Sequence, residues 1–220
     1  MNTLTSDLLS SIADPQLRLG ISEYIDLWRS GLKKQANSSI RKTMQYFDTL
    51  DENTRRVFED NLCKSIENSK TDRRLPYEIS VRLERSLKQS ADNNEMPRSR
   101  WYCMLFCTGS QMIREIYRKH PDDYPIAEMY FSSLLSDLDF GAHHFPEGCC
   151  ISEDHYHECV SECEQLFSIH SFADALRSEF SYYKALYTAY YSWDRNCDFS
   201  EFCKLHGIGF TAVPAYYYTE

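Results

Sequence analysis

Residues 171–193 read SFADALRSEFSYYKALYTAYYSW, and this stretch decides the predicted fold class. At 3.6 residues per turn, its apolar side chains form two neighbouring lines along a single helix. Only a narrow polar stripe remains, so we expect other elements to surround this helix on most of its circumference. Ser171 is the predicted N-cap, because its side chain can accept a hydrogen bond from the first turn. The two apolar lines are Phe172, Leu176, Phe180, Tyr183, Tyr187 and Tyr190, and Tyr182, Leu186, Ala189 and Trp193.

The aromatic content of this predicted helix indicates a role in the core. Seven aromatic residues fall from Phe180 to Trp193, and each buried aromatic side chain removes roughly 150–250 Å² from water. We therefore interpret the segment as a structural helix that dominates the core. An aromatic ligand pocket is the alternative interpretation.

Helical periodicity continues over most of the chain and predicts an all-α fold. Asp14, Asp51 and Asp198 each precede a segment of helical apolar spacing and are expected to be N-caps. The nearest candidate for a strand is a short extended piece at residues 210–213. We predict an irregular multi-helix bundle of roughly eight to ten helices, in one body or in two packed lobes. The expected helices cover residues 3–13, 15–31, 38–50, 51–68, 76–89, 101–120, 125–141, 152–170, 171–193 and 198–207.

Residues 90–100, SADNNEMPRSR, are the predicted boundary between two lobes. This stretch is polar, contains Asn-Asn and proline, and separates a near-neutral half from an acidic half. The predicted lobes are a near-neutral helical lobe at residues 1–92 and an acidic helical lobe at residues 97–220, which contains the aromatic helix. A single domain is the alternative, because a chain of 220 residues can still bury one core.

The formal net charge of −9 is unevenly distributed. Residues 1–100 contain 17 Lys and Arg against 15 Asp and Glu, a net of +2, whereas residues 101–220 contain 7 against 18, a net of −11. Between Lys119 and Arg177 there is no Lys or Arg, but there are 12 acids. In the first hundred residues the acids alternate with the bases, which favours ion pairs on helix surfaces over nucleic-acid contact.

A folded acidic surface repels nucleic acid and anionic membranes and attracts basic proteins. We therefore predict a cytosolic protein-binding protein that docks a basic protein partner and contacts neither nucleic acid nor membrane. Its most specific form is an immunity protein that neutralises a toxin such as a nuclease. A general contribution of negative charge to solubility is the alternative. The predicted partner-binding residues are Asp137, Asp139, Glu147, Glu153, Asp154, Glu158 and Glu162.

Residues 143–163 collect histidines and cysteines, which are side chains that zinc prefers as ligands. On one helix, His155, Cys159 and Cys163 fall on one side at positions i, i+4 and i+8. A zinc-stabilised regulatory domain, with a fourth ligand from residues 143–150, is therefore the alternative function. Because no paired CxxC spacing is present, packing of the cysteines is favoured and no metal ligand is assigned.

The sequence contains no recognisable catalytic motif. GxSxG, GxGxxG, GxxxxGK(S/T) and HExxH are all absent, so no catalytic residue and no cofactor are assigned. The nine cysteines cannot all pair within the chain, and free thiols are the expected form. The opening residues have neither a basic start nor a long apolar run, which predicts a cytoplasmic location.

Overall fold

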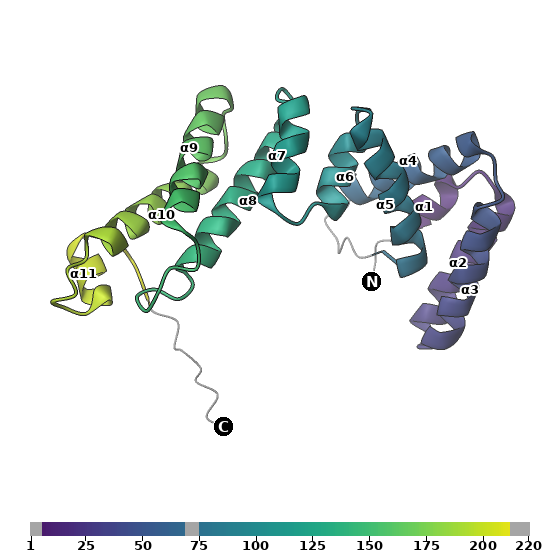
Figure 1. Cartoon of the computed structure of the whole chain (residues 1–220). Helices are drawn as coiled ribbons and strands as arrows, with labels where there is room; N and C mark the ends of the chain where they lie inside the picture. Colours follow the sequence, from purple (N-terminus) through teal and green to yellow (C-terminus); the bar gives the residue numbers. More distant parts are fainter. Residues whose placement is uncertain (1–5, 69–74, 212–220) are drawn as a thin grey trace. The chain divides into compact units, whose positions relative to one another are not determined.

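The computed structural model describes residues 6–68 and 75–211 of the chain (Figure 1). These residues form eleven helices and no strand, so the predicted all-α fold class is confirmed. Within these ranges, none of the helices has the length and apolar composition that crossing a bilayer requires. The helices are α1 Ser6–Ser11, α2 Pro15–Arg29, α3 Lys33–Phe47, α4 Glu52–Asn68, α5 Tyr77–Asp92, α6 Arg98–Phe106, α7 Ser110–Lys119, α8 Tyr124–Ala142, α9 Glu153–Ile169, α10 Asp174–Ser192 and α11 Phe199–Leu205.

One predicted helix is divided into two in the structure. The segment expected at residues 101–120 forms α6 and α7, and residues 107–109 between them are not helical. Gly109, the N-cap of α7, is extended, with φ −138° and ψ 153°. Threonine and glycine are weak helix formers, which favours a break at this point. The predicted start of the first helix and the predicted extended piece at residues 210–213 lie partly outside the described residues.

The chain folds as two compact units, Met1–Phe106 and Cys107–Glu220. The division differs from the gap at residues 93–96 expected from the sequence, because α6 packs against α5 and α4. Trp101 of α6 is 1% exposed, and its Nε1 donates a hydrogen bond of 3.0 Å to Glu67 of α4. Burial of this large side chain therefore holds α6 in the first unit.

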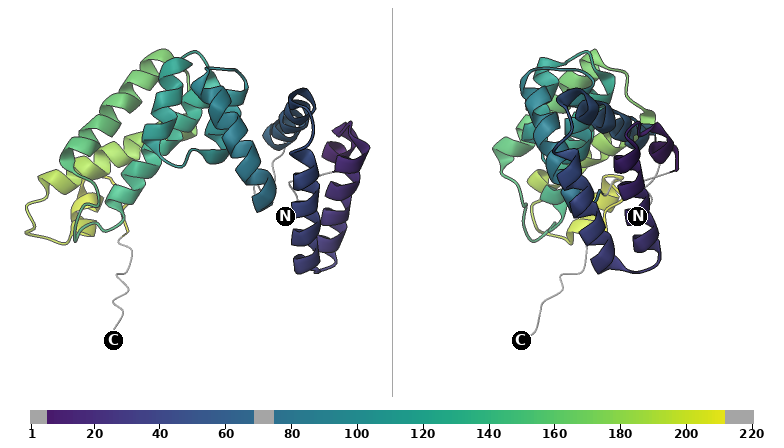
Figure 2. Two further views of the ribbon diagram at one scale, coloured as in Figure 1. Left: turned by 45° about the vertical axis from the view of Figure 1, so that its right-hand side comes forward. Right: turned by 90° about the vertical axis from the view of Figure 1, so that its right-hand side faces the viewer.

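The paired helices α2 and α3 form one side of the first unit and lie side by side in both views (Figure 1 and Figure 2). Asp14 is the N-cap of α2, as predicted, and its Oδ1 accepts a hydrogen bond of 2.8 Å from the Leu17 amide. A Cβ at Gly20 would lie 2.2 Å from Thr43 Oγ1, so glycine permits the close approach of the two helices. The buried apolar residues are Leu17, Ile21, Tyr24 and Ile25 of α2 and Ala36, Ile40, Met44 and Phe47 of α3.

Helix α8 is central to the second unit, because α7, α9 and α10 each pack against it. Phe131 of α8 is fully buried and lies among rings from the helices that follow. Its ring stacks on Phe172 at 4.9 Å between centroids and meets Phe167 of α9 edge-on at 4.8 Å. Phe180 of α10 lies 6.1 Å from the same ring. One side chain of α8 therefore contacts rings on both sides of the α9–α10 connection.

The aromatic helix α10 begins later than predicted. Its N-cap is Ala173, which makes no side-chain capping bond, so the predicted N-cap at Ser171 is wrong. The reason is the burial of Phe172, which is 4% exposed. Because this ring stacks on Phe131, the chain before Asp174 stays extended instead of continuing the helix.

Helix α10 buries one face only, which corrects the expectation that neighbours surround most of it. Ser178 and Ala185, on the opposite side of the helix, are exposed. The buried tyrosine hydroxyls find acceptors: Tyr183 Oη donates to Asp139 Oδ1 at 2.7 Å, and Tyr187 Oη donates to the Leu138 carbonyl at 2.9 Å. The stretch therefore contributes to the core, as predicted, through one face. The buried residues of α10 are Phe180, Tyr183, Leu186, Tyr187 and Ala189.

We predict that Gly141→Ala destabilises the second unit. A Cβ at this position would lie 2.0 Å from Tyr187 Oη and 2.6 Å from Ile151 Cγ1, and both neighbours would have to move. Overpacking of this kind costs about 1–3 kcal/mol in the free energy of unfolding. Denaturant unfolding followed by circular dichroism measures the change.

The matched control is Gly148→Ala, because no atom lies within 4 Å of a Cβ at that position. This variant is expected to unfold like the wild type. Tyr187→Phe removes the nearest clashing atom, so adding Gly141→Ala to that background should destabilise less than it does alone. Equal destabilisation in both backgrounds would show that the Tyr187 hydroxyl is not the source of the clash.

Candidate functional site

The seven predicted partner-binding acids do not share one face. Asp137 and Asp139 both lie on α8 but contact different neighbours. Asp137 Oδ2 accepts a hydrogen bond of 2.5 Å from Ser110 Oγ of α7, whereas Asp139 accepts from Tyr183 of α10. The other acids are Glu147 in the loop after α8 and Glu153, Asp154, Glu158 and Glu162 on α9.

Arg114 of α7 forms ion pairs with two of these acids. Its Nη1 lies 2.5 Å from Glu158 Oε1, and its Nη2 pairs with Glu162 Oε1. Glu162 Oε2 also accepts a hydrogen bond of 3.1 Å from Tyr130 Oη. Burial, and next the charge of Glu162, raise the pKa of the Tyr130 hydroxyl, which therefore remains a donor. Arg114 precedes the stretch between Lys119 and Arg177 in the sequence, but in the folded unit its charge partly compensates two acids of that stretch.

Glu153 and Asp154 are exposed in the first turn of α9. Ser152 is the N-cap, and its Oγ accepts a hydrogen bond of 3.2 Å from the His155 amide. Glu153 Oε1 lies 3.7 Å from His157 Nε2. Acids in a first turn interact favourably with the helix dipole, so these two carboxylates also stabilise the start of α9.

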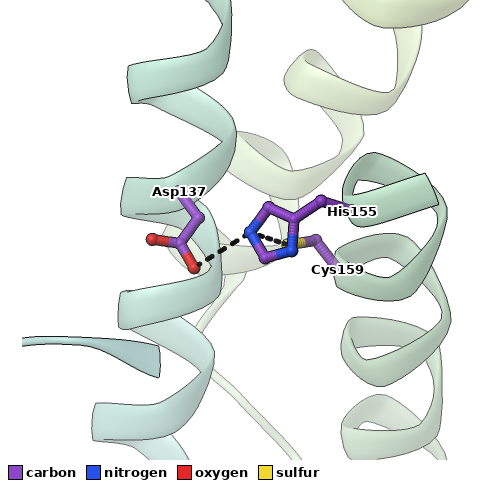
Figure 3. A group of neighbouring side chains, drawn as sticks. All are labelled: Asp137, His155 and Cys159. Carbon is purple, nitrogen blue, oxygen red and sulfur yellow. Dashed lines mark hydrogen bonds and ion pairs between the residues drawn. The ribbon is translucent and has the colours of Figure 1, made fainter. Parts of the chain in front are cut away.

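Asp137, His155 and Cys159 bring three metal-binding atoms together between α8 and α9 (Figure 3). We call these three residues the α8–α9 cluster. His155 Nε2 lies 3.6 Å from Asp137 Oδ2 and 3.7 Å from Cys159 Sγ. All three ligand atoms lie within 4.8 Å of one another, and this is the one such group among the described residues. Cys159 is buried, and the other two side chains are half-buried.

A pocket of about 280 Å³ adjoins this cluster and is lined by residues of α7, α8 and α9. His155 and Cys159 form part of its wall. Ser110, the hydrogen-bond donor to Asp137, also lines it, as does Glu158, whose Oε2 lies 3.8 Å from His155 Nδ1. Two of the three cluster residues, His155 and Cys159, therefore border a pocket within the second unit.

The geometry does not suit Cys159 as a catalytic nucleophile. In a nucleophile–histidine–acid arrangement, one imidazole nitrogen contacts the nucleophile and the other contacts the acid. Here His155 Nε2 lies closest to both Cys159 and Asp137. Burial, and then the nearby carboxylates, raise the pKa of the Cys159 thiol to about 12, so this group is protonated near neutral pH.

The structure brings Asp137, rather than Cys163, to His155 and Cys159. Cys163 is fully buried further along α9, and burial raises the pKa of its thiol. No residue of the 143–150 loop joins the cluster in the described structure. Spacing within α9 indicated two of the three ligands, whereas Asp137 comes from the preceding helix and was predicted only as a partner-binding acid.

No protein-family model matches the chain, and comparisons with curated proteins and with solved structures also found no match. Its function must therefore follow from the chemistry and geometry of its own residues.

We predict that the cysteines differ sharply in their reaction with iodoacetamide at pH 8. A thiol with a pKa near 12 holds on the order of a thousandth of the thiolate of an ordinary exposed cysteine. Cys159 and Cys163, both fully buried, should stay unmodified in the folded protein, whereas the exposed Cys150 should react. Mass spectrometry of tryptic peptides measures the extent of modification at each site.

Denaturant provides the control for this experiment, because all nine cysteines should react once the chain unfolds. Modification of Cys159 as fast as that of Cys150 in the folded protein would contradict the buried, protonated thiol.

Proposed function

We propose that the second unit binds Zn²⁺ through Asp137, His155 and Cys159. The observation that carries this proposal is the spacing of the donor atoms. Tetrahedral Zn²⁺ holds N, O and S ligands at ~2.0–2.3 Å, which places neighbouring ligand atoms roughly 3.4–3.6 Å apart. The separations of 3.6 Å for Nε2–Oδ2 and 3.7 Å for Nε2–Sγ are close to these values. The third pair, Asp137 Oδ2 and Cys159 Sγ, lies within 4.8 Å, so side-chain adjustment would be needed to complete the site.

Groups outside the ligand set support the same proposal. Ser110 holds Asp137 through a hydrogen bond of 2.5 Å, and Glu158 lies 3.8 Å from the Nδ1 of His155. A hydroxyl that donates to a ligating carboxylate orients it. At 3.8 Å Glu158 makes no hydrogen bond to His155, but its charge favours the tautomer protonated at Nδ1, which leaves Nε2 for the ion. Both outer groups belong to helices that are packed against α8.

Three protein ligands leave one position of a tetrahedral zinc ion open. The adjoining pocket of about 280 Å³ provides space for water or a small ligand at that position. Binding would displace the proton of Cys159, because a coordinated thiol binds as the thiolate. A zinc-stabilised regulatory domain with an exchangeable fourth ligand fits this arrangement best.

We expect the chelator-treated full chain to bind one equivalent of Zn²⁺. Asp137→Ala, His155→Ala and Cys159→Ser should each weaken binding by more than about tenfold, because each removes a direct ligand. Isothermal titration calorimetry measures the affinity. Titration with Co²⁺ adds a spectroscopic test, because thiolate-to-cobalt absorption should appear in the wild type and vanish in Cys159→Ser.

His157→Ala and Cys163→Ser are the matched controls, since each removes a potential ligand from the same helix but not from the cluster. Both should retain the wild-type affinity. A wild-type protein that takes up neither ion, or a loss in Cys163→Ser together with full binding in Asp137→Ala, would overturn the proposed ligand set.

Docking of a basic protein partner is a second candidate function, and the charge of the second unit supports it. Residues 107–220 contain 7 Lys and Arg against 18 Asp and Glu, a net of −11. Such a field speeds the encounter with a positively charged protein at low salt. An immunity protein that neutralises a basic toxin is the most specific form of this candidate.

The contacts within the unit narrow the proposed docking surface to the start of α9. Arg114 already forms ion pairs with Glu158 and Glu162 of α9. Asp154 has no ion-pair partner in the part of the chain that the structure describes, and Glu153 contacts only a histidine there. These two exposed carboxylates are therefore the best placed to meet a basic partner.

We expect the double variant Glu153→Lys/Asp154→Lys to associate more slowly with a basic partner and to lose salt dependence. The measurement is the association rate against a panel of basic nucleases at low and physiological ionic strength. Glu179→Lys/Glu201→Lys is the control, because it makes the same charge change at exposed positions of α10 and α11. Equal slowing in both double variants would show an effect of net charge alone and count against a docking site on α9.

A further inference from the structure

The first unit contains a polar pocket of about 540 Å³ that is walled mainly by α4 and α5. We call it the arginine pocket. Phe47 is its single apolar lining residue, and its volume falls in the range of roughly 300–1,000 Å³ typical of small-molecule sites. A lining of this composition favours a small, polar, anionic ligand. The five arginines are Arg55, Arg56, Arg82, Arg85 and Arg98.

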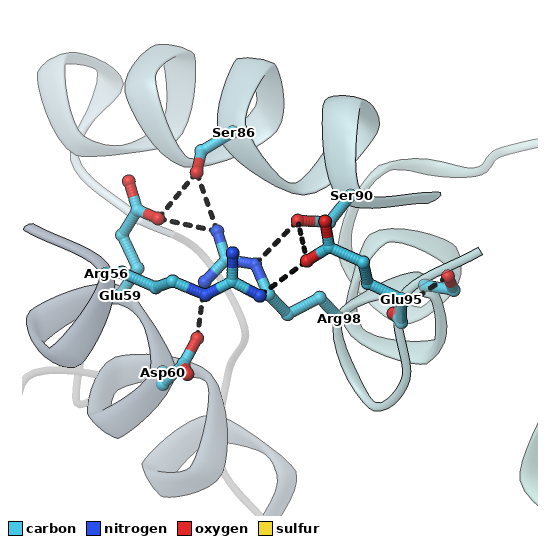
Figure 4. A network of polar contacts seen from close by, with 8 residues as sticks. Arg56, Glu59, Asp60, Ser86, Ser90, Glu95 and Arg98 are labelled. Carbon is cyan, nitrogen blue, oxygen red and sulfur yellow. Dashed lines mark hydrogen bonds and ion pairs between the residues drawn. The ribbon is translucent and has the colours of Figure 1, made fainter. Parts of the chain in front are cut away.

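Three of these arginines are held by carboxylates of the same unit. Arg98 is the most enclosed, at 2% exposed, and its Nη2 lies 2.6 Å from Glu59 Oε2 (Figure 4). Its Nε donates a hydrogen bond of 2.9 Å to Ser90 Oγ. A buried guanidinium requires such partners, so this set has a structural role. The remaining pairs are Arg98 with Asp60, Arg56 with Glu95, and Arg82 with Asp48 and with Glu78.

Arg55 of α4 and Arg85 of α5 differ from the other three, because neither forms an ion pair within the described residues. Arg55 Nε is buried and has no hydrogen-bond acceptor there. Both guanidinium groups act on Asp48, whose pKa is lowered first by the hydrogen bond from Arg82 and further by the charges of Arg55 and Arg85. Arg82 pairs with both Asp48 and Glu78, whereas Arg55 and Arg85 act on Asp48 through their charge alone.

We infer that the arginine pocket binds the phosphate group of a small polar ligand through Arg55 and Arg85. The planar fork of a guanidinium matches the oxygens of a phosphate group. Such a ligand would pair with the two arginines of the pocket that no carboxylate holds. The lining acids are Asp48, Glu52, Glu59 and Glu95, and Glu78 and Asp60 from outside the lining pair with Arg82 and Arg98.

The test is a titration of the full chain with inorganic phosphate, followed by isothermal titration calorimetry in a low-salt buffer without phosphate. We expect saturable binding by the wild type. Arg55→Gln and Arg85→Gln should each weaken binding by about tenfold or more, because each removes charge-assisted hydrogen bonds to the anion.

Arg41→Gln is the matched control. It removes one positive charge from the same unit, but its side chain is 67% exposed and pairs with Glu78 outside the pocket. Arg85 is exposed, so Arg85→Gln tests the inference even if Arg55→Gln disturbs folding; circular dichroism checks each variant. Absence of saturation, or equal weakening in Arg41→Gln, would overturn the inference and leave the pocket as an ion-pair network. The outcome is independent of zinc binding, which concerns the other unit.

Discussion

The second unit depends on the way in which Phe131 of α8 holds the two helices that follow. This fully buried ring meets Phe167 of α9 edge-on and stacks on Phe172 just before α10. Aromatic pairs of this kind contribute roughly 0.5–1.5 kcal/mol each beyond the area that they bury. Because they determine where α9 lies against α8, they also determine the separation of Asp137 and His155. The candidate metal site is therefore a consequence of core packing further along the same two helices.

Signals within one segment predicted most helices, whereas contacts between segments were not visible in the sequence. Asp198 was predicted correctly as an N-cap, because capping involves a side chain and amides only two or three residues away. Ser171 shows the same local pattern, but burial of Phe172 in the core keeps that stretch extended. The contribution of Asp137 to the cluster could not be predicted for a similar reason. Asp137 lies on α8 and His155 on α9, and spacing within one helix does not relate residues of two helices.

In both units, the ion pairs between helices could not be predicted from the distribution of charge along the sequence. A count along the chain leaves the acidic stretch without a base, yet Arg114 reaches Glu158 and Glu162 from α7, outside that stretch. In the first unit the count is nearly balanced, and the sequence favoured surface ion pairs for its bases. Arg56 and Arg82 form such pairs, whereas the pair of Arg98 with Glu59 is buried and Arg55 and Arg85 form none. Net charge along a chain therefore predicts the long-range field better than it predicts a site.

Zinc binding and docking of a basic partner would act on neighbouring charges of the second unit, and the two functions are compatible. The ion brings a charge of +2 and Cys159 loses a proton, so the unit as a whole becomes less acidic by a single charge. At physiological ionic strength the field of that charge decays over about 8 Å. It acts mainly on carboxylates in the adjoining turn of α9, such as Glu153 and Asp154. A distant basic protein would still meet a strongly acidic unit, whereas contacts at the start of α9 would respond to the metal.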